Sequence, residues 1–360
     1  MLPYRTRVAD AELDELLSVL PAVLIEGPKG VGQTQTAEQR AGSVIRLDDR
    51  AQREIAAAHP ATVLSGARPV LIDEWQRLPE MWDAVRRAVD ADGRANQFLL
   101  TGSASPLQPG THSGAGRIVQ VRMRPMTLSE RGVAKPTVSL SRLLEGRAKK
   151  LVGRSDVTLV DYTHEIVASG FPALRSLTGR VLRAQLDGYL ARIVDRDIPE
   201  FGRLVRQPQT LRRWMNAYAA ATSTTASLET IRDAATGGEG EKPARSTSIQ
   251  YREILERLWI VDPVPAWDPS RNTMVSLLQA PKHQLADPAL AARLLGATEV
   301  SLLGGAMPTR VHERPGVDAA KPRDGAMLGR LFESLVTLDV RVYAQGAESQ
   351  VRHLRAYNGR

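Results

Sequence analysis

The feature that most constrains this chain is a glycine-rich turn that follows a short apolar run near its start. The apolar run is Ala22–Glu26 (AVLIE), and the turn is Gly27–Thr34 (GPKGVGQT). Glycines in such a turn let backbone N–H groups converge on a phosphate, and the positive end of the following helix adds to the attraction. Thr34 is the residue type that ligates Mg²⁺ in loops of this kind. The pattern therefore predicts a strand, a phosphate-binding loop and a helix, in that order.

One position departs from the pattern of P-loop nucleoside triphosphatases. That pattern places a lysine before the final threonine, where its ammonium binds the β- and γ-phosphates, and this chain has Gln33 there. An amide carries no full charge, so we expect impaired ATP hydrolysis and weakened binding. Lys29 in the same loop is a cation that could reach a phosphate and soften the loss. Glycine-rich turns between a strand and a helix also occur without any ligand, which is the alternative for the loop on its own.

A second segment adds a pair of acids to the loop. Pro69–Glu74 (PVLIDE) is an apolar strand that ends in two carboxylates. Asp73 is placed to hold the Mg²⁺ shell, and Glu74 to orient or deprotonate an attacking water. Although a buried strand can end in acids without any ligand, the order and spacing of the two signals favour a nucleotide site.

Three further strands complete an alternating pattern of strands and helices. They are Gln97–Ser103, Ser43–Asp49 and Arg117–Met123, and helices are expected at Thr34–Arg40 and Met81–Ala91. Alternation of this kind predicts a parallel sheet whose ligands lie at the carboxyl ends of its strands. Thr101 and Ser103 end one of these strands, where their hydroxyls can sense a γ-phosphate.

In combination, these motifs resemble those of the prokaryotic AAA-type ATPases with the AAA_14/DUF4143 architecture. The matching motifs are GPKGVGQT, LIDEWQRLP, FLLTGS, GR followed by RPMTLSE, then SGFPALR, YLARIVDRDIPE and GRLFESLV. The resemblance implies an ATPase core, a winged helix and a C-terminal domain related to restriction-endonuclease-like nucleases. It also makes Thr101 or Ser103 the first sensor, and Arg117 an arginine sensor or finger.

Composition agrees with a multidomain protein that carries no export signal. The 360 residues include no cysteine, which excludes disulfides and thiolate metal sites and fits a cytoplasmic bacterial protein. No apolar run is long enough to span a membrane. The net charge of +8 permits a polyanionic partner such as double-stranded DNA, but much of it is scattered arginine. None of the six histidines forms a pair spaced like metal ligands.

A three-helix segment follows the ATPase-like part. Helices are expected at Leu211–Ala221, at Ser227–Ala235 with Ser227 as N-cap, and from Ser246 through Leu258, and Trp259–Val261 is expected to form a wing strand. This is the winged-helix pattern, whose third helix can enter the major groove. The residues of that helix expected to face outward are Ser246, Thr247, Gln250 and Arg252. Glu253 and Glu256 on the same helix would repel phosphate, so a rigid connector or a protein dock is the alternative.

The C-terminal part carries one element of a nuclease-like site. GRLFESLV resembles the helix that supplies the first acid, here Glu333, but no Glu-x-Lys pair follows before Arg360. One acid cannot assemble a hydrolytic metal site, so either the chain is a truncated product or this module is structural. We expect no nuclease activity.

The sequence therefore predicts an α/β protein with a P-loop parallel-sheet core, a helical and winged-helix region, and an incomplete α/β C-terminal module. The expected divisions are 1–135, a helical linker or lid at 136–206, the winged helix at 207–268, and 269–360. The expected ligands are ATP and Mg²⁺, with catalysis by Glu74 and Arg117 and metal binding by Thr34 and Asp73.

The alternative is a non-catalytic adaptor or DNA-binding regulator with a relic P-loop, and a protein partner or homo-oligomer is compatible with both. A nucleotide kinase is disfavoured because the paired acids suit water activation. The residues expected to bind nucleotide are Gly27, Pro28, Lys29, Gly30, Val31, Gly32, Gln33, Thr34, Gln35, Thr101 and Ser103.

Overall fold

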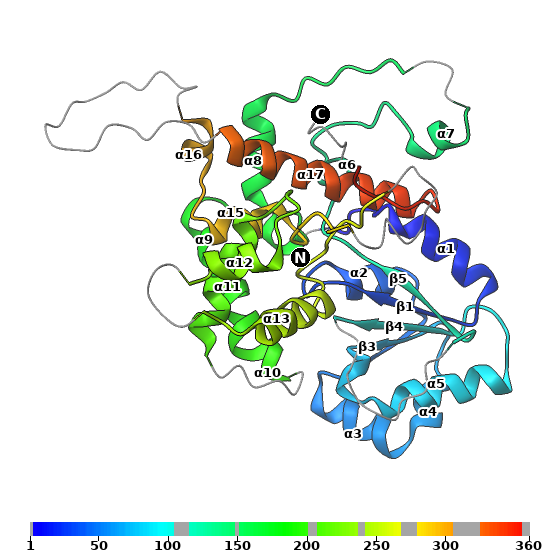
Figure 1. Cartoon of the computed structure of the whole chain (residues 1–360). Coiled ribbons are helices and arrows are strands. Elements are labelled where there is room, and N and C mark those ends of the chain that lie inside the picture. The colour runs from blue at the N-terminus through cyan, green and yellow to red at the C-terminus, as the bar shows by residue number, and fades with distance from the viewer. Residues whose placement is uncertain are drawn as a thin grey trace, which may run out of the picture.

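A parallel sheet forms one side of the molecule, and helices form the rest (Figure 1). The structure, a computed structural model, describes residues 3–103, 115–147, 151–200, 207–236, 242–267, 279–304 and 325–354. The sheet has five strands in the order β2-β3-β4-β1-β5, and every neighbouring pair is parallel. The α/β core expected from the sequence is thereby confirmed. The strands are β1 (Ala22–Glu26), β2 (Ser43–Arg46), β3 (Val70–Asp73), β4 (Phe98–Gly102) and β5 (Ile118–Arg122).

Helices cover both faces of the sheet, which is why the inner strands β1, β3 and β4 are buried along their whole length. One face packs against the helices that follow β2 and β3, and its core includes Leu24, Ile72 and Leu100. The other face, with Val23 and Ile25, joins a core that continues through the C-terminal helices as far as Leu335. The helices nearest the sheet are α1 (Ala9–Val19), α2 (Gln33–Glu38), α3 (Arg50–Ala58), α4 (Pro60–Leu64), the 3₁₀ turn η1 (Trp75–Arg77) and α5 (Glu80–Ala91).

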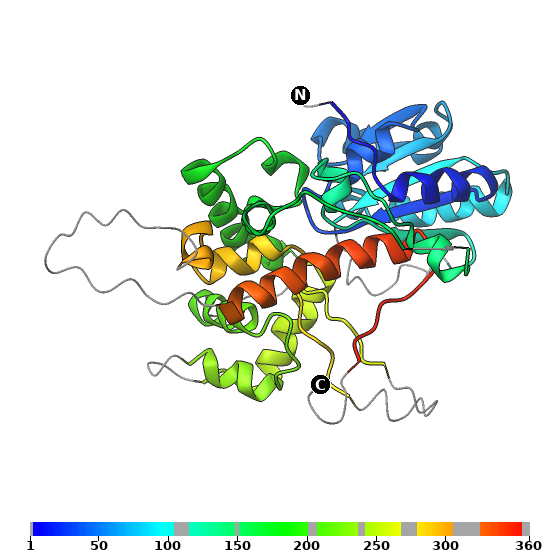
Figure 2. The ribbon, with the colours of Figure 1, turned by 90° about the horizontal axis from the view of Figure 1, so that it is seen from above.

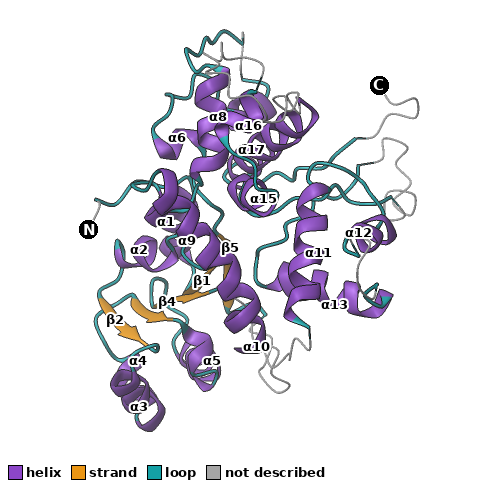
Figure 3. Ribbon diagram, turned by 90° about the vertical axis from the view of Figure 1, so that its left-hand side faces the viewer, coloured by secondary structure: helices purple, strands orange, loops and turns teal. Residues whose placement is uncertain are grey.

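The rest of the described chain is helical. In the view of Figure 3, α9 and α10 lie in front of the strands. The long helix α17 crosses the molecule from α15 and α16 to α7 (Figure 2). The elements are α6 (Leu128–Arg131), α7 (Leu140–Leu144), α8 (Leu159–Ala168), η2 (Pro172–Leu174), α9 (Gly179–Arg192), the π-helical turn η3 (Ile193–Asp197), α10 (Ile198–Glu200), α11 (Pro208–Ala220), α12 (Leu228–Ala234), α13 (Arg245–Arg257), α15 (Pro288–Leu294), α16 (Glu299–Leu303) and α17 (Gly325–Gln345).

Helices α11, α12 and α13 lie where the sequence predicts three helices. Ser227 caps α12 by accepting a hydrogen bond from the backbone N–H of Thr230, as expected of an N-cap. After α13 the chain forms single antiparallel bridges, Val261 with Leu285 and Val264 with Lys282. Residues 237–241, between α12 and α13, lie outside the described residues. The winged-helix assignment stays a prediction.

The expected DNA-facing side chains are partly engaged within the protein. Arg252 pairs with Glu256 at 3.4 Å, and Arg212 on α11 pairs with Asp195 at 2.7 Å. Gln250 is exposed. Four further basic residues, Lys149, Lys150, Arg203 and Arg206, lie outside the described residues.

One buried carboxylate joins the sheet to the helical region. Asp262 receives the guanidinium groups of Arg122, Arg124 and Arg341 at 2.9, 3.0 and 2.7 Å. Burial alone would raise the pKa of Asp262, but the three arginines hold it at about 2. Arg122 also lies 4.3 Å above the ring of Trp259. Asp262 therefore links β5, the segment after it, the segment after α13, and α17.

The predicted division into four regions stays a prediction, because hydrophobic contact is continuous across the expected boundaries. One cluster includes Leu13 of α1, Trp214 of α11 and Leu331 of α17. Glu333 of α17, the expected first acid of a nuclease, pairs with Lys282 at 2.5 Å. Among the described helices, none has the length and apolar character needed to cross a membrane.

Candidate nucleotide-binding site

The glycine-rich turn joins β1 to α2 and is shaped by its glycines. Gly30 and Gly32 have φ angles of +78° and +102°, which other residues adopt at a cost. A Cβ at Gly27 would lie 2.2 Å from the carbonyl oxygen of Met123, so only glycine fits beside β5. Pro28 and Val31 are buried, whereas Gly30 and Gln35 are exposed. The loop is therefore packed against the protein on one side, and part of its length is exposed to solvent.

Gln33 occupies the lysine position and binds two backbone carbonyls. Its Nε2 donates to the carbonyl oxygen of Gly27 at 3.1 Å and to that of Gly102 at 3.0 Å. The first bond closes the loop on itself, and the second ties it to the end of β4. Because Gln33 is buried, its amide replaces the bonds to water that these carbonyls would lose. The side chain stabilises the loop and supplies no charge to it.

Asp73 lies beside the loop and collects two hydroxyl groups. Thr34 Oγ1 donates to Asp73 Oδ1 at 2.7 Å, and Thr101 Oγ1 donates to the same oxygen at 2.6 Å. The three residues come from α2, β3 and β4. Parallel strands bring their carboxyl ends to one edge of the sheet, so these distant segments meet there. The structure thus brings together the two residues expected to hold a metal and one of the two expected sensors.

Glu74 follows Asp73 in a left-handed conformation, with φ of 57°. Burial, and next the charge of Asp73, raise the pKa of its carboxyl group above the usual value. Gln76 Nε2 donates to Glu74 Oε2 at 2.6 Å and reaches Ser103 Oγ at 3.5 Å. Gln76 therefore connects the candidate base to the second candidate sensor, a role that the sequence did not indicate. A base with a raised pKa is better matched to proton transfer near neutral pH.

Lys29 is engaged by the helical region. Its Nζ donates to Asp197 Oδ1 at 2.5 Å, and the hydroxyl of Tyr189 donates to its carbonyl oxygen at 3.2 Å. Burial raises the pKa of the Tyr189 hydroxyl above its usual value, so this group stays protonated and can donate. The motif YLARIVDRDIPE, noted in the sequence for its resemblance, holds both partners.

Arg7 holds the loop from its other side. Its guanidinium donates to the carbonyl oxygens of Val31 at 2.9 Å and Arg124 at 2.6 Å, and pairs with Glu130 at 3.1 Å. This contact was missed in the sequence, because a lone arginine ahead of the first helix carries no motif. The loop is braced by groups from three separate parts of the chain.

The structure does not bring Arg117 to the site. Arg117 precedes β5, and Ile118 pairs in register with Ala22, at the amino end of β1. The loop begins at the opposite end of β1. Arg117 is exposed there and pairs with Asp90 of α5 at 2.7 Å. The expected sensor role within the same chain is therefore corrected: a residue before a parallel strand lies at the edge away from the ligand.

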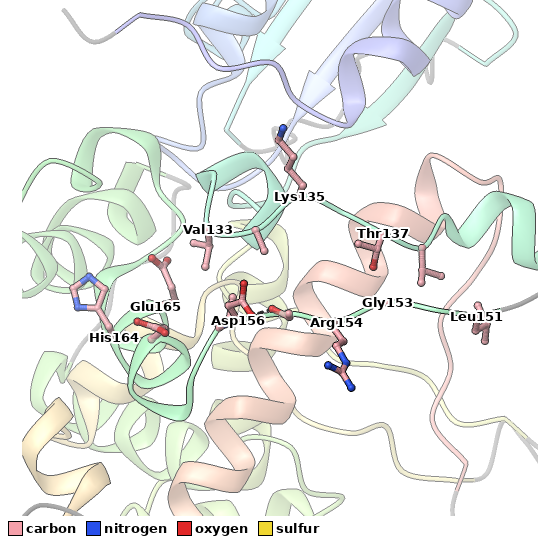
Figure 4. Close-up of a pocket in the computed structure, with 14 residues that line it drawn as sticks. Val133, Lys135, Thr137, Leu151, Gly153, Arg154, Asp156, His164 and Glu165 are labelled. Carbon is pink, nitrogen blue, oxygen red and sulfur yellow. Dashed lines mark hydrogen bonds between the residues drawn. The ribbon is translucent and has the colours of Figure 1, made fainter.

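A separate hollow of about 980 Å³ lies between residues 133–138, residues 151–157 and the start of α8 (Figure 4). The amino group of Lys135 and the guanidinium of Arg154 point in opposite directions there, so they do not converge on one anion. Glu165 in its wall is held by Arg131 and Arg175 at 3.1 and 2.9 Å. Nothing in this hollow resembles a phosphate site.

Two family models match separate parts of the chain. The first, described as AAA domain, matches residues 20–131. The sheet, the phosphate loop and the paired acids all fall within that range. This part of the chain is therefore similar to AAA domains. The second, a domain of unknown function (DUF8612), matches residues 159–301, which include α8 to α15 of the described helices and cross two of the expected boundaries. The DUF4143 and nuclease-like assignments stay predictions.

Two curated relatives match the chain over most of its length. They are uncharacterized proteins of Mycobacterium tuberculosis and Mycobacterium bovis, each 26% identical over 298 residues that make up 81% of this chain. The chain spans 59% of the length of these relatives.

Solved structures similar to this chain include archaeal proteins. A Walker-type ATPase of Pyrococcus abyssi is 15% identical, with a TM-score of 0.45, over 82% of this chain and 99% of that one. The ORC2 protein of Aeropyrum pernix, in ADPNP–ADP complexes, is 16% identical with a TM-score of 0.38, over 82% and 94% of the two chains. At these scores the likeness carries no argument about sites.

The residues around the phosphate loop fit a nucleotide–Mg²⁺ complex in part. Thr34 and Asp73 are the oxygen ligands that would hold Mg²⁺, which prefers carboxylate oxygens and phosphates. The glycines of the loop leave room for phosphate oxygens to approach its backbone N–H groups. The full positive charge expected at position 33 is replaced by an amide.

Proposed function

We propose that this chain is an ATP-binding protein of the AAA type that couples its nucleotide state to its helical region, with hydrolysis weak because Gln33 replaces lysine. The observation that carries the proposal is the meeting of Thr34, Thr101 and Asp73 beside a glycine-shaped loop. A hydroxyl from the loop helix and another from the neighbouring strand, both on one buried carboxylate, suit a site for Mg²⁺ and phosphate.

The proposed roles follow from these positions. Backbone N–H groups of Gly30–Thr34 bind phosphate, Thr34 and Asp73 hold Mg²⁺, and Glu74 orients or deprotonates water. Thr101 and Ser103 sense the terminal phosphate. Lys29 supplies the cation that position 33 lacks.

Titration of the purified protein with fluorescent ATP, with and without Mg²⁺, tests this proposal. We expect saturable binding that Mg²⁺ strengthens. Asp73→Ala should remove the effect of Mg²⁺, whereas Asp90→Ala, a surface acid at the far edge of the sheet, should leave it unchanged. Failure of the wild type and of Gln33→Lys to bind would reject the nucleotide site and favour a relic loop.

A non-catalytic adaptor is the competing proposal for the same chain. It is supported by the hydrogen bonds that Gln33 donates to two backbone carbonyls, because they give the loop a structural role without any ligand. Hydrolysis distinguishes the two proposals in the Gln33→Lys background. Glu74→Gln should abolish turnover there while nucleotide stays bound. Equal turnover in the parent and the variant would indicate a contaminating ATPase and favour the adaptor.

Double-stranded DNA is a proposed partner through the winged-helix prediction, supported by the net charge of +8. Since Arg212 and Arg252 are in ion pairs, the remaining candidates for base contact on α13 are Ser246, Thr247 and Gln250. Fluorescence anisotropy with the full chain, at low and physiological salt, tests this. Binding that falls steeply with salt is expected. No binding even at low salt would leave α13 as a protein-docking helix.

We propose that the protein self-assembles, and the position of Arg117 is the one observation that supports this. Because Arg117 is exposed at the edge of the sheet away from its own loop, an arginine finger at this position would act on a neighbouring copy. Arg117→Ala should lower turnover only under conditions in which the protein oligomerises. The C-terminal module is proposed to be structural, with Glu333 serving its ion pair to Lys282 rather than a metal.

A further inference from the structure

The π-helical turn η3 contacts both the phosphate loop and the first helix of the three-helix segment. Asp197 Oδ1 accepts from Lys29 Nζ at 2.5 Å, and Asp195 accepts from Arg212 of α11 with both oxygens at 2.7 Å. π-Helical turns are rare and occur often at functional sites. A single turn of five residues therefore carries two carboxylates, one for the loop and one for α11.

The pair between Lys29 and Asp197 is mostly buried on its acidic side. The side chain of Asp197 is 7% exposed, and that of Lys29 is 32% exposed. A buried carboxylate that loses its partner costs several kcal/mol unless it reaches water or another cation. Anything that draws Lys29 away must therefore also move Asp197, and with it the turn.

Lys29 is close enough to Glu74, which follows β3, for its charge to oppose the rise in the pKa of that carboxyl group. A phosphate bound between the loop and β3 would be a second anion within reach of the same ammonium. Lys29 is also the only lysine of the loop, because position 33 is glutamine. Phosphate and Asp197 thus present alternative partners for one cation.

We propose that Asp197 is an internal competitor for the phosphate of the nucleotide. When phosphate takes Lys29, the carboxylate of Asp197 leaves its buried position, η3 shifts, and the pair between Asp195 and Arg212 passes the shift to α11. The coupling exists because the two states of Lys29 differ in their partner, which is the differential contact that allostery requires. This inference rests on the proposed function, since it needs nucleotide at the loop.

Two measurements test the proposal on the full chain. The first is the affinity for fluorescent ATP with Mg²⁺. The second is hydrogen–deuterium exchange of residues 193–197 and 208–220 with and without ATP. The variants are Asp197→Asn, which keeps an acceptor but removes the charge, and Asp197→Glu, which keeps the charge. Asp195→Asn is the matched control, because it makes the same chemical change in the same turn on the side of α11.

We expect Asp197→Asn to bind ATP about fivefold or more tightly than the wild type, and Asp197→Glu to stay close to the wild type. In the wild type, ATP should raise exchange in η3 and in the first turns of α11. Asp195→Asn should keep the wild-type affinity and the change in η3, but lose the change in α11.

Several results would overturn the proposal. Unchanged or weaker binding by Asp197→Asn, with Asp197→Glu folded and binding normally, would show that Asp197 does not compete. Exchange in residues 193–220 that ATP leaves unaltered would exclude the coupling. If the wild type and Gln33→Lys both fail to bind ATP, the proposed function fails as well, whereas binding without an effect of Asp197 rejects this inference alone.

Discussion

Gln33 donates its side-chain amide to the carbonyl oxygen of Gly102, 3.0 Å away at the end of the neighbouring strand. A second bond to Gly27 makes the same side chain close the phosphate loop on itself. The residue that replaces the expected lysine thus stabilises the loop through two hydrogen bonds. The loss of the lysine charge and the added rigidity of the loop are separate effects of Gln33, and different substitutions at position 33 can distinguish them.

Replacing Gln33 with lysine should strengthen ATP binding. A hydrogen bond to a charged group contributes about 1.5–3 kcal/mol, so we expect about a ten- to hundredfold gain in affinity. Titration with fluorescent ATP measures it. Gln33→Ala is the control, because it leaves two buried carbonyls without a partner, and its free energy of unfolding should fall by about 1–3 kcal/mol. Equal ATP affinity of Gln33→Lys and the wild type would mean that position 33 does not face phosphate.

The pH dependence of hydrolysis should report the environment of Glu74. Its pKa is raised by burial and by Asp73, and only the ionised form accepts a proton. Turnover of Gln33→Lys should therefore decline as pH falls through this raised pKa, at a higher pH than for a carboxylate in water. A stopped assay of phosphate release across the pH range measures the midpoint. Gln76→Ala removes the donor to Glu74 and should move the midpoint further up, and a midpoint that does not respond would assign the titration to another group.

Asp339 should make stability fall as pH rises. Burial raises the pKa of this carboxyl group from 3.8 to about 7, although the N–H of Leu128 and the charge of Arg131 oppose the shift. A raised pKa contributes stability that is full below the unfolded value and is lost as pH rises through the folded value. Asp339→Asn removes this dependence. Between pH 5 and pH 8 the free energy of unfolding of the wild type should fall by about 2–3 kcal/mol relative to the variant.

Urea denaturation of both proteins at the two pH values gives that difference directly. Other titrating groups are common to both proteins and cancel. If the difference in free energy of unfolding between the wild type and Asp339→Asn is the same at both pH values, Asp339 keeps the same charge from pH 5 to pH 8. Ser334→Ala, on the same helix and also buried but not titratable, should show no such pH-dependent difference from the wild type.

Removing the carboxylate of Asp262 should destabilise the whole chain. Asp262→Ala leaves three guanidinium groups without their shared partner, and breaking a buried ion pair costs about 3–5 kcal/mol. Thermal unfolding followed by circular dichroism measures the loss. Asp195→Ala, which breaks an exposed pair, should cost about 1 kcal/mol or less. A similar small effect for Asp262 would mean that water reaches the cluster.

Local pattern predicted the sheet well. Apolar runs at 22–26 and 97–103, each bounded by glycine or polar residues, needed only their own neighbours to be recognised as strands. The position of Asp73 and Glu74 near the loop could be predicted because the carboxyl ends of parallel strands meet at the edge of the sheet where ligands bind. The resemblance makes Arg117 a sensor or finger, but Arg117 precedes β5 and therefore lies at the edge of the sheet away from its own loop.

The contacts around the loop could not be predicted in the same way. Asp197 and Lys29 are far apart in the chain, and only the packing of α9 beside the sheet brings them together. Nor does an arginine at position 7 carry any local sign that it will bind the carbonyl of Val31. Such contacts depend on the complete fold, whereas strands and loops depend on a few adjacent residues.

The cluster at Asp262 has a consequence for how such chains can diversify. Its four members lie in three stretches, near residues 122, 262 and 341, that no single cut keeps together. A recombination event that exchanged the helical region for another would remove Asp262 together with Arg341 and leave Arg122 and Arg124 without their shared acid. We expect the sheet-containing part and the helical region to be inherited as a unit, and fusions that respect only the linear boundaries to yield insoluble protein.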